Sequence, residues 1–368
     1  MQPETGSCDS VPAELDLSKS ASIRYNNGSF ISQSVFVNPK SVHLLLPGLF
    51  SGFQQSEVET SDLQSSFLLQ KLVSKADRRQ LNEADKFSAD YLRQYPLAYY
   101  QYLTADAEAV PVKAVLYATP VNLELKSDHI VARPLAIDDS QQHRLASIID
   151  RFNQHFKDDG LLLRLLPSGQ LLCLSSRYDS AQMTPVYAVY GRDIKHFLPE
   201  GETAKFWLRI FNETQMLLHE YFEHDQRTFD KQELNSFWFW GAPLNQGIGL
   251  VDAAFIGKPD WLKGCCEHHG LKQLALHELA ESDQQTIYII DEALLLAASS
   301  GDFAGWLKAL SRLEADLIAP LFELLKRGTI QQISLPSASV CYQFKNSHRL
   351  RFYRKNKSIT ELCVKAYE

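Results

Sequence analysis

The sequence predicts an α/β fold, with helices on both faces of a core sheet, and two observations carry this prediction. The run Phe-Trp-Phe-Trp at 237–240 is apolar at consecutive positions, which is typical of a strand buried on both faces, such as a central parallel strand under helices. In the C-terminal third, apolar runs at 286–290 and 330–335 flank an amphipathic helix at 301–325. A strand, a helix and a second strand in this order indicate an α/β sheet.

The other elements follow from shorter patterns. An apolar run predicts a strand at 42–46 that stops at Pro47-Gly48. Helical patterns predict helices at 66–73, at 87–102 with an interruption at Pro96, at 141–156 and, most clearly, at 202–222. Further strands are expected at 113–118, 121–125, 130–133, 161–166, 170–175, 340–344 and 350–353. Pro167-Ser168-Gly169 between two of these strands is a hairpin signal.

These patterns divide the chain into four regions. They are a flexible polar tail at 1–35, an N-terminal part of the α/β core at 36–110, an inserted α+β subdomain at 111–200, and a C-terminal part of the core at 201–368. The subdomain is distinguished by short strands around one helix. The length of 368 residues allows such a division.

Charge and hydropathy exclude several classes of partner. The net charge of −7 argues against nucleic acid, because binding to phosphates needs a basic surface. A local cationic patch near the C-terminus, more often a solvated face than a binding site, is formed by Arg349, Arg351, Arg354, Lys355 and Lys357. No apolar run reaches the roughly 18 residues of a membrane span. We therefore expect neither a nucleic acid nor a membrane as partner.

The N-terminus and the cysteines indicate the compartment. The first 35 residues have no cationic start and no apolar signal core, so secretion is not expected. The six cysteines are scattered without the spacing of a disulfide framework, which favours thiols in a reducing environment. The predicted localisation is cytoplasmic.

A line of polar side chains marks the first candidate site. Asn212, Gln215 and His219 follow one another at helical spacing beside the apolar face of the 202–222 helix. They could face a cleft, although a polar stripe of this kind is more often solvated surface. Asn235 and Ser236 precede the 237–240 strand and need hydrogen-bond partners if they are buried.

Acidic residues after the C-terminal strands are the second candidate. Asp291-Glu292-Ala293 follows the strand at 286–290, a position suited to metal or substrate chemistry and equally to a helix N-cap. Asp302 has the same N-cap alternative at the start of the next helix. Cys265-Cys266-x-His268-His269 with His277 is not expected to bind zinc, because adjacent residues rarely point at one centre and no Cys-x-x-Cys pair accompanies them. There is no phosphate-binding glycine motif.

Several of these segments in this order resemble a known family. The segments are Thr119-Pro120-Val121-Asn122, Asp128-His129-Ile130, Phe156-x-x-Asp159-Gly160-Leu161, Gly191-Arg192-Asp193-Ile194, Asn212-Glu213-x-Gln215-Met216, Asn235-Ser236-Phe237-Trp238-Phe239-Trp240-Gly241 and Gly301-Asp302. Across roughly residues 110–355 the chain resembles the bacterial RpfE-type regulatory protein family. That family is related to the archaeal-type branch of cofactor-independent phosphoglycerate mutases, in the alkaline phosphatase superfamily.

The resemblance implies an alkaline-phosphatase-like α/β core with an inserted α+β subdomain. In active mutases of this type, two divalent metals activate a serine nucleophile, because metal coordination lowers the pKa of the hydroxyl. This sequence departs from that pattern: Pro47-Gly48 follows the first strand without a ligand aspartate, and Leu294-Leu295 follow Asp291-Glu292-Ala293 where Gly-His would stand. The later Asp-His pair is replaced by Leu335-Pro336-Ser337.

Three hypotheses follow. The favoured one is a degenerate phosphoglycerate-mutase-like protein, regulatory or ligand-binding, that uses no cofactor and binds a small phosphorylated or carboxylated ligand in a cleft between the core sheet and the 111–200 subdomain. Its candidate ligand-binding residues are Asn212, Gln215, His219, Arg227, Asn235, Ser236, Trp238, Trp240 and Asp291. The second is an active phosphomutase or phosphatase that holds manganese or zinc through Asp291, Asp302 and His219. The third is a protein-interaction module, whose partner the sequence does not name.

Overall fold

The computed structural model describes eight segments of the chain. They are residues 40–50, 67–81, 91–105, 111–135, 139–224, 234–245, 253–337 and 340–356. The predicted tail at 1–35 and the candidate Arg227 lie outside these segments. None of the helices in the described segments is long and apolar enough to cross a membrane.

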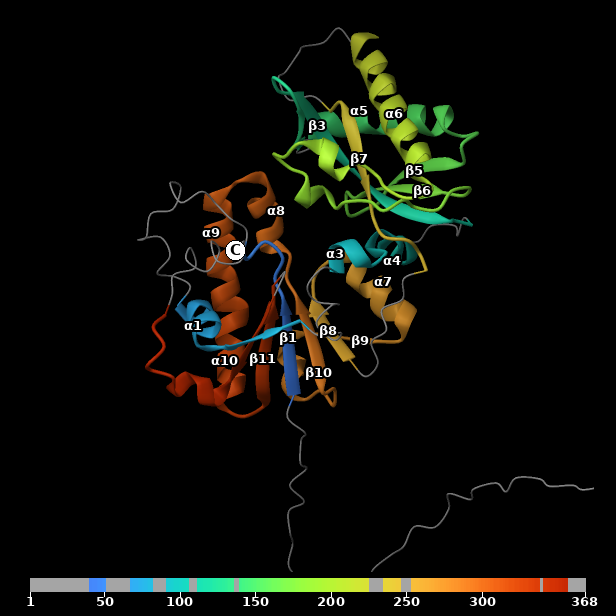
Figure 1. The fold of residues 1–368 in the computed structure, drawn as a ribbon. Helices are drawn as coiled ribbons and strands as arrows, with labels where there is room; N and C mark the ends of the chain where they lie inside the picture. The colour runs from blue at the N-terminus through green and yellow to red at the C-terminus, as the bar shows by residue number, and fades with distance from the viewer. Residues whose placement is uncertain are drawn as a thin grey trace, which may run out of the picture. The chain divides into compact units, whose positions relative to one another are not determined.

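The larger of two sheets has seven strands and is mainly parallel (Figure 1). In spatial order its strands are β2 (Asp77–Gln80), β12 (Val340–Lys345), β11 (Ile330–Pro336), β1 (Lys40–Leu45), β10 (Thr286–Ile290), β8 (Ala253–Gly257) and β9 (Lys272–Leu274). The five strands from β11 to β9 are parallel, and β12 and β2 add an antiparallel edge. This confirms the predicted α/β class.

Both faces of this sheet are buried because side chains alternate between two cores. On β10, Ile287 and Ile289 enter one core, and Tyr288 and Ile290 enter the other. The first core is covered by α1 (Phe67–Lys75), α8 (Ala293–Ser300), α9 (Phe303–Leu313) and α10 (Ala319–Lys326). The second is covered by α3 (Tyr91–Gln94), α4 (Leu97–Thr104) and α7 (Asp260–His269). Figure 1 shows the sheet with helices of these two groups beside it.

The smaller sheet has five strands, and every strand pair in it is antiparallel. Its strands are β3 (Ala114–Leu125), β4 (Ile130–Pro134), β5 (Leu161–Leu165), β6 (Leu171–Ser175) and β7 (Ser236–Trp240). The long helices α5 (Asp139–His155) and α6 (Ala204–His224) accompany it, with the short 3-10 helices η3 (Val186–Ala188) and η4 (Ile194–Phe197). The predicted hairpin at 167–169 and both long helices are confirmed.

The prediction that residues 237–240 form a central parallel strand was wrong. β7 pairs antiparallel with β3, and Trp240 lies opposite Tyr117. Both faces of β7 are nevertheless buried: Phe239 packs against aromatic rings of α5 and α6, whereas Trp240 meets Tyr187 of η3. Burial on both faces produces the same sequence pattern in either strand direction, so the apolar run could not reveal the direction.

The predicted helix at 301–325 is interrupted by a π-helical turn. This turn, η6 (Glu314–Ile318), separates α9 from α10, and the N–H of Ala319 bonds the carbonyl of Glu314, five residues earlier. Pro320 follows directly and has no N–H to continue the α-helical ladder. Pro320 thus accounts for the widened turn, a feature that is frequent at functional sites.

Helices α4 and α7 pack closely because α7 carries a glycine at the contact. A Cβ atom at Gly264 would lie 1.9 Å from the carbonyl oxygen of Tyr100. Neither backbone can withdraw without disturbing the core around Tyr100, which is 1% exposed.

Gly264→Ala is therefore expected to destabilise the fold by about 1–3 kcal/mol, the usual cost of overpacking. An alanine in an open helical position would instead stabilise by about 1 kcal/mol. Urea unfolding followed by circular dichroism measures the difference. Lys263→Ala, at the exposed neighbouring position, is the control and should change stability by less than about 0.5 kcal/mol. Equal stability of the two variants would contradict the close packing.

Candidate functional site

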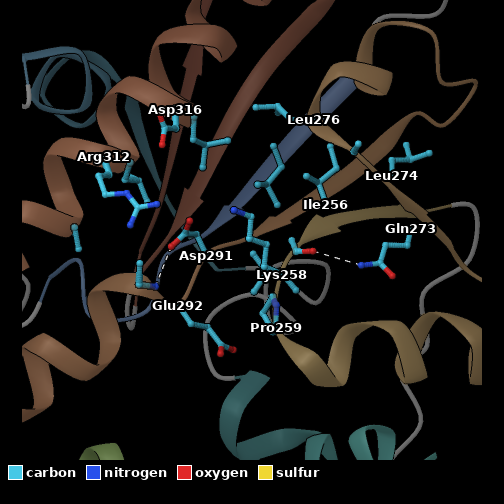
Figure 2. A pocket seen from close by; sticks show the side chains of 18 residues that line it. Ile256, Lys258, Pro259, Gln273, Leu274, Leu276, Asp291, Glu292, Arg312 and Asp316 are labelled. Carbon is cyan, nitrogen blue, oxygen red and sulfur yellow. Dashed lines mark hydrogen bonds between the residues drawn. The ribbon is translucent and has the colours of Figure 1, made fainter. Parts of the chain in front are cut away.

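A cavity of about 920 Å³ lies at the carboxyl ends of β8, β9 and β10 (Figure 2). Open α/β sheets bind their ligands at this edge. The apolar part of the wall includes Ile256, Leu274, Leu276, Ile289, Leu313 and Leu317. The polar part consists of Lys258, Gln273, Asp291, Glu292, Arg312 and Asp316. A few polar groups on an apolar wall, in a volume of this size, are typical of small-molecule sites.

The end of β8 brings Lys258 to the cavity. A Cβ atom at Gly257 would lie 2.7 Å from the carbonyl oxygen of Ile290, so glycine permits the close approach of the neighbouring strand β10. The chain then turns through Lys258 and Pro259 into helix α7, which begins at Asp260. Lys258 itself is exposed, and Figure 2 shows its side chain at the cavity.

The end of β10 carries two adjacent carboxylates with different roles. The N–H of Asp291 donates to the carbonyl of Leu45 on β1, at 3.1 Å. Its carboxylate accepts from the N–H of Ala293 at 2.9 Å and so supports the start of α8. The N-cap of α8 is Glu292, so the N-cap alternative for Asp291 was wrong by one position, although its carboxylate binds the first helical N–H. The half-buried side chain of Asp291 lines the cavity.

Glu292 turns its carboxylate toward the helices of the opposite face. Its Oε1 accepts from the hydroxyl of Tyr91 at 2.8 Å and from the indole N–H of Trp261 at 3.2 Å. Burial raises the pKa of Glu292 above its ordinary value, the two hydrogen bonds oppose this, and the charge of Asp291 adds to the rise. Glu292 is therefore a carboxyl group that retains its proton to higher pH than a solvated one.

Two cations face the cavity without a carboxylate partner. Within the described segments, no ion pair involves Lys258 or Arg312. Figure 2 shows Arg312 and Asp291 as neighbours on one side of the lining, with Lys258 nearby. A phosphate or carboxylate placed here would meet a planar guanidinium fork and a lysine point charge. Asp291 and Asp316 would accept hydrogen bonds from hydroxyl or amino groups of the same ligand.

The residues predicted from the sequence lie mostly elsewhere. Of the described candidates, Asp291 lines the cavity and the others do not. Asn212 and His219 are exposed on α6, and Gln215 is half-buried on that helix. Ligand binding by these three side chains stays a prediction.

The polar residues and tryptophans of β7 make structural contacts. The side chain of Asn235 accepts from the N–H of Leu123 at 2.7 Å and donates to the carbonyl of Leu123 at 2.9 Å, which extends the pairing of β7 with β3. The buried hydroxyl of Ser236 lies 3.5 Å from the carbonyl of Phe237. The indole N–H groups of Trp238 and Trp240 donate at 2.8 Å to the Thr184 carbonyl and to Thr119 Oγ1. These contacts satisfy the polar groups without any ligand.

The ligand set suggested for a metal centre does not come together. Asp302 caps α9 by accepting from the N–H of Gly305 at 2.9 Å, and His219 lies on α6 beside the smaller sheet. Among the described residues, no three His, Cys, Asp or Glu side chains are grouped as metal ligands. Cys265 and Cys266 are buried in α7, and His269 contacts the hydroxyl of Tyr100. The described residues do not fit the two-metal centre of active mutases.

Sequence reasoning missed Lys258 and Arg312. Lys258 had a usable signal, because it follows an apolar run and precedes Pro259, as expected at the end of a strand. Arg312 had none, since its place in an amphipathic helix suggested solvated surface.

No family model matches the chain. The probable 2,3-bisphosphoglycerate-independent phosphoglycerate mutase of Geobacter sulfurreducens is 25% identical over 165 residues, which cover 38% of this chain and 41% of the relative. The sequence is thus distantly similar to a cofactor-independent phosphoglycerate mutase. The match spans less than half of the relative's length.

Two solved structures align along most of the chain. The cofactor-independent phosphoglycerate mutase of Thermoplasma acidophilum is 13% identical with a TM-score of 0.33, and the alignment covers 84% of this chain and 90% of that structure. The PH0037 protein of Pyrococcus horikoshii is 12% identical with a TM-score of 0.41, over 83% of this chain and 87% of that structure. Such TM-scores do not establish a common fold. The resemblance to RpfE-type regulatory proteins stays a prediction.

The raised pKa of Glu292 predicts a pH-dependent stability. The folded state holds this proton more tightly than the unfolded state, whose pKa is near 4.5. The stability that this bound proton contributes is fully present below the unfolded-state pKa. It is lost as the pH rises through the pKa of Glu292 in the folded state. Glu292→Gln cannot ionise and keeps an oxygen for Tyr91 and Trp261. The variant should be more stable than the wild type at pH 7.5, with the difference vanishing near pH 4.

Urea unfolding across this pH range measures the effect. Glu267→Gln, on the exposed face of α7, is the control and should follow the wild type. Parallel pH profiles of wild type and Glu292→Gln would show that Glu292 ionises as a solvated carboxyl group.

Proposed function

We propose that this protein is a degenerate phosphoglycerate-mutase-like protein that binds a small phosphorylated or carboxylated ligand in the cavity between β8, β10 and α9. The observation that carries the proposal is the pair of cations, Lys258 and Arg312, beside Asp291 in a cavity with a mixed apolar and polar wall. In this arrangement the anionic group of the ligand lies between the two cations. The site differs from the predicted cleft and shares Asp291 with it.

The mixture of charges selects a class of ligand. An inorganic anion would gain from Arg312 and Lys258 but would meet repulsion from Asp291 and Asp316. A hydroxylated organic acid or phosphate ester satisfies both sets, because its hydroxyl groups donate to the carboxylates. The apolar wall formed by Ile256, Ile289 and Leu317 accommodates its carbon skeleton.

The packing at the end of β1 supports a degenerate site. A Cβ atom at Gly48 would lie 2.8 Å from the carbonyl oxygen of Leu294, and the carbonyl of Gly48 accepts from the indole N–H of Trp306 at 2.9 Å. Leu294 is fully buried. In the active mutases that the chain resembles, the corresponding region is expected to hold metal ligands from the first strand and from the Gly-His motif. Here leucine and tryptophan occupy the same neighbourhood, so ligand binding without metal-dependent turnover is the better-supported use of the fold.

A regulatory role is the finer part of the proposal. It rests on the sequence resemblance to RpfE-type proteins and on a site that binds a metabolite without converting it. Such a protein would change its interactions when the ligand is bound.

Binding of 3-phosphoglycerate to the full chain tests the site by isothermal titration calorimetry. Arg312→Ala and Lys258→Ala should each weaken binding by about 10- to 100-fold, because each removes a charge-assisted hydrogen bond of about 1.5–3 kcal/mol. Lys308→Ala is the matched control, since Lys308 is exposed on the same helix and does not line the cavity. Inorganic phosphate should bind more weakly than the ester. Binding that is unchanged in Arg312→Ala and Lys258→Ala but lost in Trp240→Ala would favour the originally predicted cleft.

An active mutase is the competing function, favoured by the similarity to the Geobacter sulfurreducens relative. Metal analysis of the purified protein, with a phosphoglycerate mutase assay in added manganese or zinc, separates the two. We expect no turnover. Stoichiometric metal together with turnover that Asp291→Ala abolishes would overturn the proposal.

A further inference from the structure

A short segment after strand β12 presents apolar side chains to solvent. Leu350, Phe352 and Tyr353 have exposed fractions of 74%, 89% and 70%. Leu350 ends the 3-10 helix η7 (Asn346–Leu350), and Phe352 and Tyr353 follow it in a turn in which the N–H of Phe352 donates to the carbonyl of Leu350 at 2.8 Å. We call Leu350, Phe352 and Tyr353 the apolar tip. Three neighbouring apolar side chains this exposed differ from single surface hydrophobics, which need no explanation.

The arginines of the same segment point inward, which is the reverse of the usual arrangement. Arg351 donates to the carbonyl of Lys75 at 3.0 Å and pairs with Asp77. Arg354 donates to the carbonyl of Ala76 at 2.7 Å. Both thus bind the last carbonyls of helix α1, where cations are favoured. The segment is anchored by its charged residues and exposes its apolar ones.

Cations from three elements lie near the segment that carries the apolar tip. Lys71 and Lys75 lie on α1, Lys326 ends α10, and Arg349 lies in η7. They are close in space: after burial, the charges of Lys75, Arg349 and Lys326 lower the pKa of Lys71. The hydrogen bond from Lys326, together with the charges of Arg327 and Arg349, lowers the pKa of Glu323. Figure 1 shows α1, α10 and the red C-terminal segment in the same part of the α/β core.

Few carboxylates offset these charges. Within the described segments, the ion pairs of this surface use Asp77 and Glu323. The cations, counted with the inward arginines, are Lys71, Lys75, Lys326, Arg327, Arg349, Arg351 and Arg354. Counted over the described residues, the surface is therefore positive in a chain whose net charge is −7.

We propose that this surface docks the protein on an anionic lipid bilayer, with the apolar tip in the interfacial region and the cations at the headgroups. Aromatic and aliphatic side chains beside lysine and arginine are the composition of peripheral membrane-binding surfaces. Phe352 and Tyr353 offer rings on which bases can stack, but Leu350 does not, whereas a lipid interface accommodates all three side chains. Docking departs from the expectation that no membrane is a partner, which rested on the absence of a spanning segment; docking does not require such a segment.

Sedimentation of the full chain with vesicles tests the proposal. The vesicles are phosphatidylcholine alone or an equimolar mixture with phosphatidylglycerol. We expect binding to the anionic vesicles, weakened by salt. Arg349→Ala and Lys326→Ala should each lower the affinity by about fivefold, the effect of one basic residue near an anionic surface. Phe352→Ser should lower it by about tenfold or more, since it removes the most exposed apolar side chain.

The controls are matched in exposure and charge. Leu125→Ser replaces an apolar side chain that is 77% exposed on the smaller sheet, and Lys308→Ala removes a cation elsewhere on the core. Both should bind like the wild type, and circular dichroism verifies that all variants are folded. Equal binding to neutral and anionic vesicles, or equal loss in Phe352→Ser and Leu125→Ser, would overturn the proposal. Binding to single-stranded RNA without binding to vesicles would also overturn it, and would assign the surface to nucleic acid.

Discussion

The parallel pairing of β1 with β10, buried on both faces, is the constraint on which the rest of the α/β core depends. The two strands pair from Ser41 opposite Thr286 to Leu45 opposite Ile290, and the N–H of Asp291 adds a further bond to Leu45. Alternate side chains enter opposite cores, so a shift of one residue would exchange the two faces. Because each buried aliphatic side chain contributes about 1.5–3 kcal/mol, the register is fixed strongly. The fixed register places the strand ends, and the cavity with them, at one edge of the sheet.

The acidic residues that were candidates for metal ligands, Asp291 and Asp302, bind N–H groups at helix starts. Asp291 supports the start of α8, and Asp302 caps α9. The buried Glu314, which was not a candidate, accepts in the same way from the N–H groups of Leu68 and Leu69 at 2.6 and 3.1 Å in the first turn of α1. Each carboxylate satisfies N–H groups that a helix leaves without partners in its first turn. Their common position at helix starts reflects the architecture. It brings no three of them to a single centre in the described segments.

The sequence predicted what local periodicity determines. The helix at 202–222 was clear because its apolar positions recur every three or four residues, and α6 occupies Ala204–His224. The direction of β7 was not predictable, because an apolar run reports burial on both faces and carries no information on the partner strand. Asn235 was noticed as a polar residue in need of a partner, but its partner, Leu123, is 112 positions away. Arg312 belongs to the cavity through packing between α9 and β10, which no local pattern encodes.

Helix α9 contacts both the packed end of β1 and the cavity beside β10, at the same edge of the sheet. In its first turn, the indole of Trp306 binds the carbonyl of Gly48 and helps to close the end of β1. Near its end, Arg312 and Leu313 line the cavity beside β10. The π-helical turn that follows inserts one residue into the helical register, so that Glu314 reaches α1 while Asp316 and Leu317 line the cavity. A substitution that opened the end of β1 by moving Trp306 would therefore also displace Arg312. Helix α9 therefore determines both features of this edge. Its Trp306 makes the end of β1 apolar, and its Arg312 contributes charge to the cavity at the ends of β8 and β10.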